Sequence, residues 1–346
     1  MYDRPPEVSD GLRLHLNENT AGCSPRVLDA LRGLTARDIG CYPGYEAAIR
    51  ECAAYLGVSD DQVLLCNGLD EGLMALALVC LGPGAAAGGR PEAVIPEPAF
   101  ELYRIYTDIA GGHVVAVPPR PDFRFALSEI LEAITPRTRL VFLTNPNNPT
   151  GTRIARSEIH EVLARAPADA TVFLDEAYAD FSGETFLDEL PRHPHLVIGR
   201  TFAKSHGLAG IRIGCLIGAA STLLPFRRVV PVYSVNAAAV AALGAALGDR
   251  AHVAWYVAQV EASKALMYDA CDRLGLGYIV SAANFVLVKA GDRARALVDG
   301  LAARRIHVRD RGHQPGCAGC VRIATGVVDD TRRCVAAMED VLCGDR

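Results

Sequence analysis

The sequence predicts an α/β fold, with a mainly parallel central sheet covered by helices on both faces and a smaller α+β domain beside it. Two observations support this fold class. Short runs of Val, Ile and Leu alternate with amphipathic segments through the middle of the chain, and such continuously apolar runs are typical of buried parallel strands. After about residue 236 the pattern changes to Ala-rich helical segments mixed with short strands.

The elements of the large sheet follow one another at short intervals. Each expected strand is a brief apolar run between turn residues, and each expected helix has apolar residues at helical spacing. In chain order we expect strand 63–66, helix 70–81, strand 93–95, helix 100–109, strand 113–117, helix 127–134, strand 140–144, helix 157–166, and strands 171–174, 196–199 and 211–217.

The C-terminal third predicts the smaller domain. Its expected elements are helices 237–247 and 252–274, strands near 279 and over 284–288, helix 293–304, strands near 307 and over 321–324, and a helix from 330. We therefore predict an N-terminal arm over 1–28 that forms part of the small domain, a large domain over 29–236, and a small C-terminal domain over 237–346.

Composition excludes several classes of function. Thirty-five Lys and Arg against forty Asp and Glu give a formal charge of −5, which argues against binding to nucleic acid or to an anionic membrane. The longest weakly polar run, 235–248, is too short to span a bilayer. The first ten residues lack a signal-peptide pattern, and the eleven cysteines are odd in number, so we expect a cytoplasmic protein with reduced thiols.

Two short motifs suggest metal chemistry but have simpler interpretations. Cys317 and Cys320 have the spacing of a metal or redox pair, yet they lack a convincing second ligand pair and precede an expected strand. The motif His193-Pro194-His195 is interpreted as a surface turn. The sequence therefore predicts no metal site.

Three separated segments follow the ends of expected strands, where open α/β sheets bind ligands. They are NPNNPTG at 145–151, DEAY at 175–178 and TFAKSHGLAGIRIG at 201–214. Taken one at a time, each segment has an interpretation without function: the first could be a turn, Asp175 of the second could cap a helix, and the lysine of the third could be solvated in a loop. Arg212, however, lies in an apolar run and would need an anionic partner if it were buried. In combination the segments favour a ligand site.

Together these segments resemble the fold-type-I family of pyridoxal-phosphate (PLP) enzymes, specifically the aminotransferases, and more closely the histidinol-phosphate aminotransferases. The resemblance covers nearly the whole chain and extends to LNEN at 16–19, Tyr42-Pro43, DEG at 70–72, SAANFVLV at 281–288 and VRI at 321–323. It implies the PLP-dependent transferase fold and a homodimer with shared active sites. The implied reaction moves an amino group between an amino acid or histidinol phosphate and a 2-oxo acid such as 2-oxoglutarate.

The resemblance also implies roles for individual residues. Lys204 matches the lysine that forms a Schiff base with PLP and transfers the substrate proton. Asp175 matches the carboxylate that keeps the pyridine nitrogen protonated, which makes the cofactor an electron sink. Tyr178 and Asn148 match the pair that hydrogen-bonds the phenolic oxygen, and Phe100 matches the aromatic ring that stacks on the pyridine.

The phosphate and substrate sides are assigned in the same way. The expected phosphate ligands are the backbone amides of Gly68, Leu69 and Asp70, the Thr201 hydroxyl, the Arg212 guanidinium, and Tyr42 from the other subunit. Arg322 matches the arginine that receives the substrate's acidic group. Asn284, Tyr233 and His206 are the remaining expected residues on the substrate side.

The chain departs from the family pattern at three places. Asn19-Thr20-Ala21-Gly22 lacks the usual proline and the following aromatic residue, Ala203 replaces a common serine, and His206 stands where a hydrophobic residue is expected. These changes affect mainly the substrate side, so the sequence leaves the amino substrate open. A PLP-dependent decarboxylase or an oxygen-using amino-acid oxidase on the same scaffold is the alternative. A PLP-binding regulator would need a DNA-binding module, which the sequence does not contain.

Overall fold

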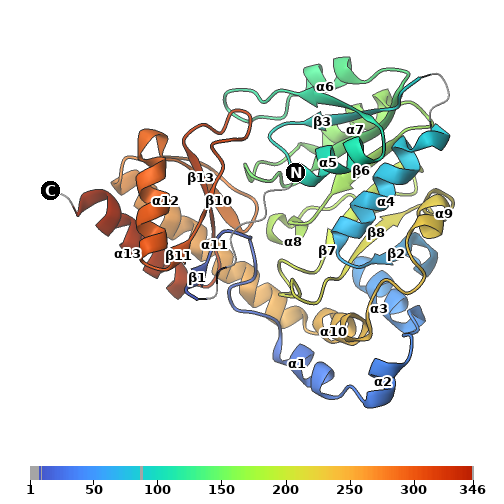
Figure 1. The fold of residues 1–346 in the computed structure, drawn as a ribbon, viewed down its shortest axis with the longest axis horizontal. Helices are drawn as coiled ribbons and strands as arrows, with labels where there is room; N and C mark the ends of the chain where they lie inside the picture. Colours follow the sequence, from blue (N-terminus) through green and yellow to red (C-terminus); the bar gives the residue numbers. More distant parts are fainter. Residues whose placement is uncertain (1–7, 9, 86–88, 345–346) are drawn as a thin grey trace.

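A seven-stranded sheet forms the larger part of the computed structural model, which describes residues 8, 10–85 and 89–344 (Figure 1). β8 is antiparallel to both of its neighbours, and the other strands run parallel to one another. The strand order is β2 (Val63–Cys66), β8 (Gly214–Gly218), β7 (Leu196–Thr201), β6 (Thr171–Asp175), β5 (Thr138–Thr144), β3 (Glu92–Pro96) and β4 (His113–Val117). The predicted α/β class with a mainly parallel sheet is confirmed.

Each face of this sheet packs against its own hydrophobic core. Leu140 and Phe142 of β5 enter one core, while Val141 and Leu143 enter the other, because successive side chains of a strand point to opposite faces. The first core is completed by α4 (Leu69–Leu81), α5 (Glu101–Ile109) and α9 (Ala220–Val229). The second is completed by α1 (Pro25–Arg32), α3 (Glu46–Leu56), α6 (Leu127–Ala133), α7 (Arg156–Arg165) and α10 (Ala237–Leu247).

A four-stranded antiparallel sheet forms the smaller part, next to the long helix α11 (Arg250–Arg273). Its strand order is β12 (Arg309–Asp310), β13 (Cys320–Ala324), β10 (Phe285–Lys289) and β9 (Gly277–Ile279). Helices α12 (Ala294–Ala303) and α13 (Val328–Cys343) lie beside it (Figure 1). The N-terminal strand β1 (Leu12–Arg13) pairs in parallel with β11 (Ile306–His307), and Leu12 and Leu14 join the core of this part.

Three features differ from the sequence expectations. The helices α1, α2 (Ala36–Gly40) and α3 were not foreseen, nor were α8 (Ala179–Ser182) and α9. The buried residues of α10 belong to a core of the seven-stranded sheet, whereas the sequence placed the start of the smaller domain at residue 237, before this helix. The division of the chain into domains stays a prediction. The strand expected over 211–217 begins at Gly214, so Arg212 precedes it.

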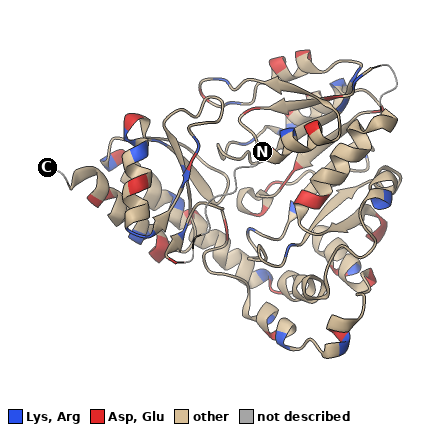
Figure 2. Ribbon diagram, viewed as in Figure 1, with Lys and Arg blue, Asp and Glu red and all other residues tan. Residues whose placement is uncertain are grey.

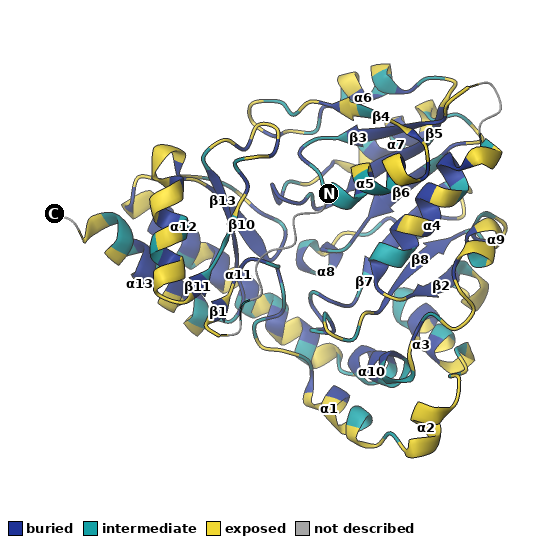
Figure 3. Ribbon diagram, in the orientation of Figure 1, coloured by how far each residue is buried: buried dark blue, intermediate teal, exposed yellow. Residues whose placement is uncertain are grey.

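Charge and burial follow the layers. Charged residues lie mainly on the outer helices and loops (Figure 2). The strands of the large sheet are almost entirely buried (Figure 3), except the edge strand β4, in which only Val117 is buried. Within the ranges that the structure covers, no helix is long and apolar enough to cross a membrane.

Candidate active site

A cleft of about 480 Å³ opens where the carboxyl ends of β6 and β7 face the β12–β13 edge of the smaller sheet. Residues from both parts of the chain and from the N-terminal segment form its walls. Among them are His15, Asn17, Leu69, Asp70, Phe100, Tyr103, Asn148, Asp175, Tyr178, Thr201, Lys204, Arg212, Arg309, Arg311 and Arg322. The three separated motifs of the sequence therefore meet in one cavity.

Lys204 lies in the loop that follows β7. Backbone hydrogen bonds from Phe202 N to Ile213 O and from Leu208 N to Phe202 O close this loop at 3.2 and 3.0 Å. The Lys204 amine donates to the Leu16 carbonyl at 3.0 Å. Burial lowers the pKa of Lys204 to about 8, and the positive charge of Arg322 acts in the same direction. A lysine with a lowered pKa is a better nucleophile and base near neutral pH.

Asp175 ends β6 as a buried carboxyl group at the bottom of the cleft. Burial raises its pKa to about 6, whereas hydrogen bonds from Tyr103 and from the Ala177 amide lower it. The Tyr103 hydroxyl donates to Asp175 Oδ2 at 2.6 Å and lies 3.0 Å from the Thr144 hydroxyl. The Tyr103 ring stacks on Phe142 at 4.5 Å. Tyr103 therefore orients the carboxylate and stabilises its charged form.

The start of α4 fits a phosphate group. Gly68 has φ +72°, and α4 has no side-chain cap, so its first amides face the cleft. A Cβ at Gly68 would lie 2.6 Å from an Arg212 guanidinium nitrogen, so only glycine lets the guanidinium lie on this turn. Arg212 itself has φ +61° and pairs with Asp70 at 2.9 Å. This combination of backbone donors and a guanidinium is the donor set that phosphate requires.

Arg322 connects the two sides of the cleft. Its guanidinium donates to Asn148 Oδ1 at 2.5 Å and to the His15 carbonyl at 2.7 Å, although the side chain is buried. Tyr178 is buried nearby, and its hydroxyl accepts a hydrogen bond from Asn17 at 3.0 Å. The Lys204 amine lies 6.0 Å from the centre of the Tyr178 ring. Asn148 and Tyr178, which the resemblance pairs at the phenolic oxygen of PLP, thus lie on the same wall of the cleft as Arg322.

Two further arginines, which sequence reasoning missed, line the same wall. Arg309 is the cross-strand partner of Arg322, and Arg311 is buried with its guanidinium 3.2 Å from Glu101. Three guanidinium groups on one wall create a positive potential that favours an anionic substrate. The motif Arg309-Asp310-Arg311 ahead of an apolar strand was a sequence signal for these residues.

Sequence reasoning also gave no site role to Tyr103, His15 or Asn17, although Asn17 lies in the LNEN motif of the resemblance. Tyr103 follows Phe100 by three residues, and that helical spacing toward the cleft was its signal. Asn17 has φ +55°, which turns the N-terminal segment against the Lys204 loop, and its neighbour Leu16 accepts the hydrogen bond from Lys204. Nothing in the sequence pattern singles out His15.

Five expected residues do not line the described cleft: Asn284, Tyr42, Tyr233, Gly68 and His206. Asn284 is fully buried beneath it and donates to the Asn17 carbonyl at 3.1 Å. Tyr42 and Tyr233 lie on the surface as a stacked pair, 4.3 Å apart and 78% and 54% exposed. Gly68 itself is not a wall residue, although its neighbours Leu69 and Asp70 are.

His206 points away from the cleft into the core behind the Lys204 loop. Its ring packs edge-on against Phe202 and Tyr55, and its Nδ1 lies 2.9 Å from the Ser205 hydroxyl. Burial lowers its pKa, against the opposing negative charge of Asp180. In this position His206 supports the lysine loop by packing. The expected contact between His206 and substrate is therefore not met in this chain, because the ring is buried against Phe202 and Tyr55 and does not line the cleft.

Comparison with known proteins agrees with this geometry. The family model for aminotransferase class I and II matches residues 9–337. A histidinol-phosphate aminotransferase of Symbiobacterium thermophilum is 38% identical over 340 residues, covering 97% of this chain and 91% of that protein. Histidinol-phosphate aminotransferase 2 of Pseudomonas aeruginosa is 34% identical, covering 96% and 90%. The crystal structure of the Sinorhizobium meliloti histidinol-phosphate aminotransferase in complex with pyridoxal-5'-phosphate superposes with a TM-score of 0.88 at 28% identity, covering 97% and 92%.

The fold and the cleft define a PLP-dependent aminotransferase of fold type I. The chain belongs to the aminotransferase class I and II family. The relatives named above are aminotransferases, so the alternative of a decarboxylase or an oxidase has no support among them.

Removing the Tyr103 hydroxyl tests its role beside Asp175. In Tyr103→Phe the ring still stacks on Phe142, but the carboxylate loses a hydrogen bond, and such a bond to a charged group contributes about 1.5–3 kcal/mol. We expect the acidic limb of the kcat profile to move upward by about one to two pH units. Tyr278→Phe, at a half-buried phenol of the smaller sheet that does not line the cleft, serves as the control. An unchanged profile in Tyr103→Phe would contradict the assignment.

The lowered pKa of Lys204 predicts the pH dependence of its reactivity. The chain has only three lysines, Lys204, Lys264 and Lys289. After PLP is removed, competitive acetylation followed by mass spectrometry should label Lys204 with a midpoint near pH 8, because only the uncharged amine reacts. The exposed Lys289 provides the internal reference. A Lys204 midpoint near the ordinary lysine value of about 10.4 would show that burial does not act as inferred.

Proposed function

We propose that the chain moves an amino group between L-histidinol phosphate and a 2-oxo acid such as 2-oxoglutarate. The observation that carries this proposal is the meeting of Lys204, Asp175 and a wall of three arginines in one cleft. The first two suit PLP chemistry, and the arginines suit a phosphate or a carboxylate on the substrate. The names of the relatives support histidinol phosphate as the amino donor.

The residues that would hold PLP fit that group. The amides of Leu69 and Asp70, the Thr201 hydroxyl and the Arg212 guanidinium supply the donors that its phosphate needs. Asp175 would hold the proton of the pyridine nitrogen, because a buried carboxylate stabilises a cation beside it. Asn148 and Tyr178 would donate to the phenolic oxygen, and Phe100 would cover the ring.

When bound, PLP supplies an electron sink for the charge that develops at the substrate carbon bearing the amino group. Lys204 would anchor the cofactor and, once released, move the proton at that carbon. Its lowered pKa keeps a fraction of the amine uncharged near neutral pH, so it can accept the proton. Tyr103 keeps Asp175 oriented while this happens.

The arginine wall would bind the acidic end of either substrate. The Arg322 guanidinium donates hydrogen bonds to Asn148 Oδ1 and to the His15 carbonyl. A substrate anion that binds through two oxygens would compete with these two acceptors for the guanidinium. Arg309 and Arg311 add charge for a phosphate dianion, which carries more charge than a carboxylate. Ala21 is exposed and stands where family members usually carry an aromatic residue. Without that aromatic side chain, the polar contacts of the arginine wall would select the substrate.

A panel of amino donors tests the function. The PLP-loaded protein is incubated with 2-oxoglutarate and one donor at a time, namely L-histidinol phosphate, L-histidinol, or an aromatic or basic L-amino acid, and L-glutamate formation is measured. We expect histidinol phosphate to be the fastest donor and histidinol to be much slower, because the arginine wall has no anion to bind. Equal rates with both would contradict the proposed substrate.

The matched control for this panel is Lys204→Ala. Because general acid–base catalysis contributes about 10²–10⁴-fold, we expect the rate to fall by at least that factor while the fold is retained. If the unsubstituted protein releases carbon dioxide in place of glutamate, it is a decarboxylase, and if it releases peroxide, it is an oxidase.

We also propose that the chain acts in the cytoplasm as a homodimer with shared active sites. The support is the stacked surface pair Tyr42 and Tyr233, because two exposed aromatic rings side by side are unusual on a free surface. In this proposal Tyr42 reaches the phosphate site of the other subunit.

Mixing two defective subunits tests the shared site. Lys204→Ala and Tyr42→Ala proteins are each assayed alone at limiting PLP, then denatured together, refolded and assayed again. In a mixed dimer one of the two sites has both residues intact, so about one quarter of all sites should regain normal activity. Activity equal to the average of the separate proteins would show that Tyr42 serves its own subunit or none.

A further inference from the structure

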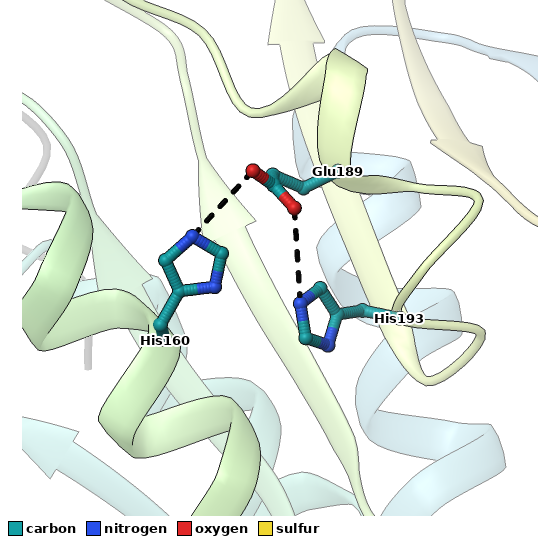
Figure 4. Close-up of side chains that lie close together, drawn as sticks. All are labelled: His160, Glu189 and His193. Atoms are coloured by element: carbon teal, nitrogen blue, oxygen red, sulfur yellow. Dashed lines mark ion pairs between the residues drawn. The ribbon is translucent and has the colours of Figure 1, made fainter.

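A second group of chemically active side chains lies outside the cleft. His160 of α7, Glu189 at the end of the short helix η3 (Leu187–Glu189) and His193 point toward one another (Figure 4). His160 Nε2 is 3.5 Å from Glu189 Oε1, and His193 Nε2 is 3.9 Å from Glu189 Oε2. These ligand atoms all lie within 4.8 Å of one another. The mechanism proposed above uses none of these residues.

The position of this group separates it from the cleft. His193 lies three residues before the start of β7, at the edge of the sheet where Leu196 pairs with Val172. Asp175 and Thr201 lie at the opposite, carboxyl edge. An ion at the histidines would therefore not contact the reacting groups.

Local structure holds the three side chains in place. The amide of His193 bonds to the Glu189 carbonyl at 3.2 Å, so residues four apart face the same side of a turn. The His160 ring packs 5.4 Å from the ring of Phe186, which belongs to the hydrophobic core. His195, the other histidine of the His-Pro-His motif, contacts the Leu163 carbonyl instead. Only His193 of that motif joins the group.

Two imidazoles and one carboxylate form a ligand set that divalent transition metals prefer. Zinc bonds of about 2.0–2.2 Å place tetrahedral ligands about 3.3–3.6 Å apart. The His160–Glu189 distance of 3.5 Å falls in this range, and the His193–Glu189 distance of 3.9 Å is slightly longer. The histidine side chains are 38% and 22% exposed, so small ring rotations can close the remaining gap. A fourth position is left open toward solvent.

Two arginines share the carboxylate and would compete with a metal. Arg192 is 74% exposed and contacts Glu189 at 3.2 Å, and such a solvent-exposed contact is weak. Arg156 contacts Glu189 at 2.9 Å but also bonds to Asp188 and to the Thr185 carbonyl, each at 2.8 Å. Arg156 therefore keeps partners if the carboxylate turns toward a metal.

We propose that His160, Glu189 and His193 form a zinc-binding site that ties α7 to the turn before β7. Water is the fourth ligand, and the ion acts on stability, because it does not contact the reacting groups. Because a ligand that binds only the folded state stabilises it, zinc at this site raises the melting temperature of the protein.

Zinc titration of the PLP-loaded full chain tests this proposal. All eleven cysteines are free in the structure, and Cys41 and Cys343 are exposed, so the titration uses a Cys41→Ser/Cys343→Ser background to limit thiol binding. Isothermal calorimetry compares this background with the same background carrying His160→Gln, His193→Gln or both. The control is His113→Gln, at an exposed histidine on β4.

We expect the double variant to bind one equivalent of zinc fewer than the background and each single variant to bind at least tenfold more weakly. Zinc should raise the melting temperature of the background and of His113→Gln, but not of the double variant. Circular dichroism confirms that each variant is folded, and Glu189→Gln provides a second route if a histidine variant is not. Identical zinc isotherms for the background and the double variant would overturn the proposal. His160, Glu189 and His193 would then belong only to an ion-pair network with the neighbouring arginines.

Discussion

The buried carboxyl group of Asp175 is the constraint on which the cleft depends. A charge that is removed from water needs partners, and the protein supplies them from several elements. Tyr103 of α5 donates to it from one side, and the Ala177 amide donates from the loop after β6. Both partners lie at the carboxyl edge of the sheet, so the carboxyl group can act only there. A cation beside this group completes its neutralisation, which is the electrostatic reason why a pyridine nitrogen suits the site.

The rest of the cleft follows from the way the two sheets face each other. The large sheet supplies Asp175 and the Lys204 loop, and the small sheet supplies the arginines. The N-terminal segment joins them, since Leu16 accepts from Lys204 and His15 accepts from Arg322. The pairing of β1 with β11, and the hydrogen bond from Ala324 N at the end of β13 to the Leu14 carbonyl, fix this segment on the smaller part of the chain. A change in the relative position of the sheets therefore changes both the lysine environment and the arginine wall.

The residues that sequence reasoning misplaced share one cause. Arg212 was taken as part of a buried strand, yet its left-handed backbone turns it onto Gly68 before β8 begins. His206 lies two residues after Lys204, and the tight loop directs it into the core instead of the cleft. In both cases the local backbone conformation decides the direction of the side chain. Hydrophobic periodicity carries no information about that conformation outside regular elements.

By itself, the sequence determined the fold class, the approximate positions along the chain of the strands of the large sheet, and the presence of Lys204, Asp175, Asn148 and Tyr178 at or after strand ends. Those features depend on local apolar patterns and on motif spacing, which are properties of contiguous residues. Only the tertiary structure decided that Tyr103 reaches Asp175, that Arg309 and Arg311 stand beside Arg322, and that His160 approaches His193. These contacts join residues from different elements. They arise from the packing of helices on the sheet and of one sheet against the other, which no single segment encodes.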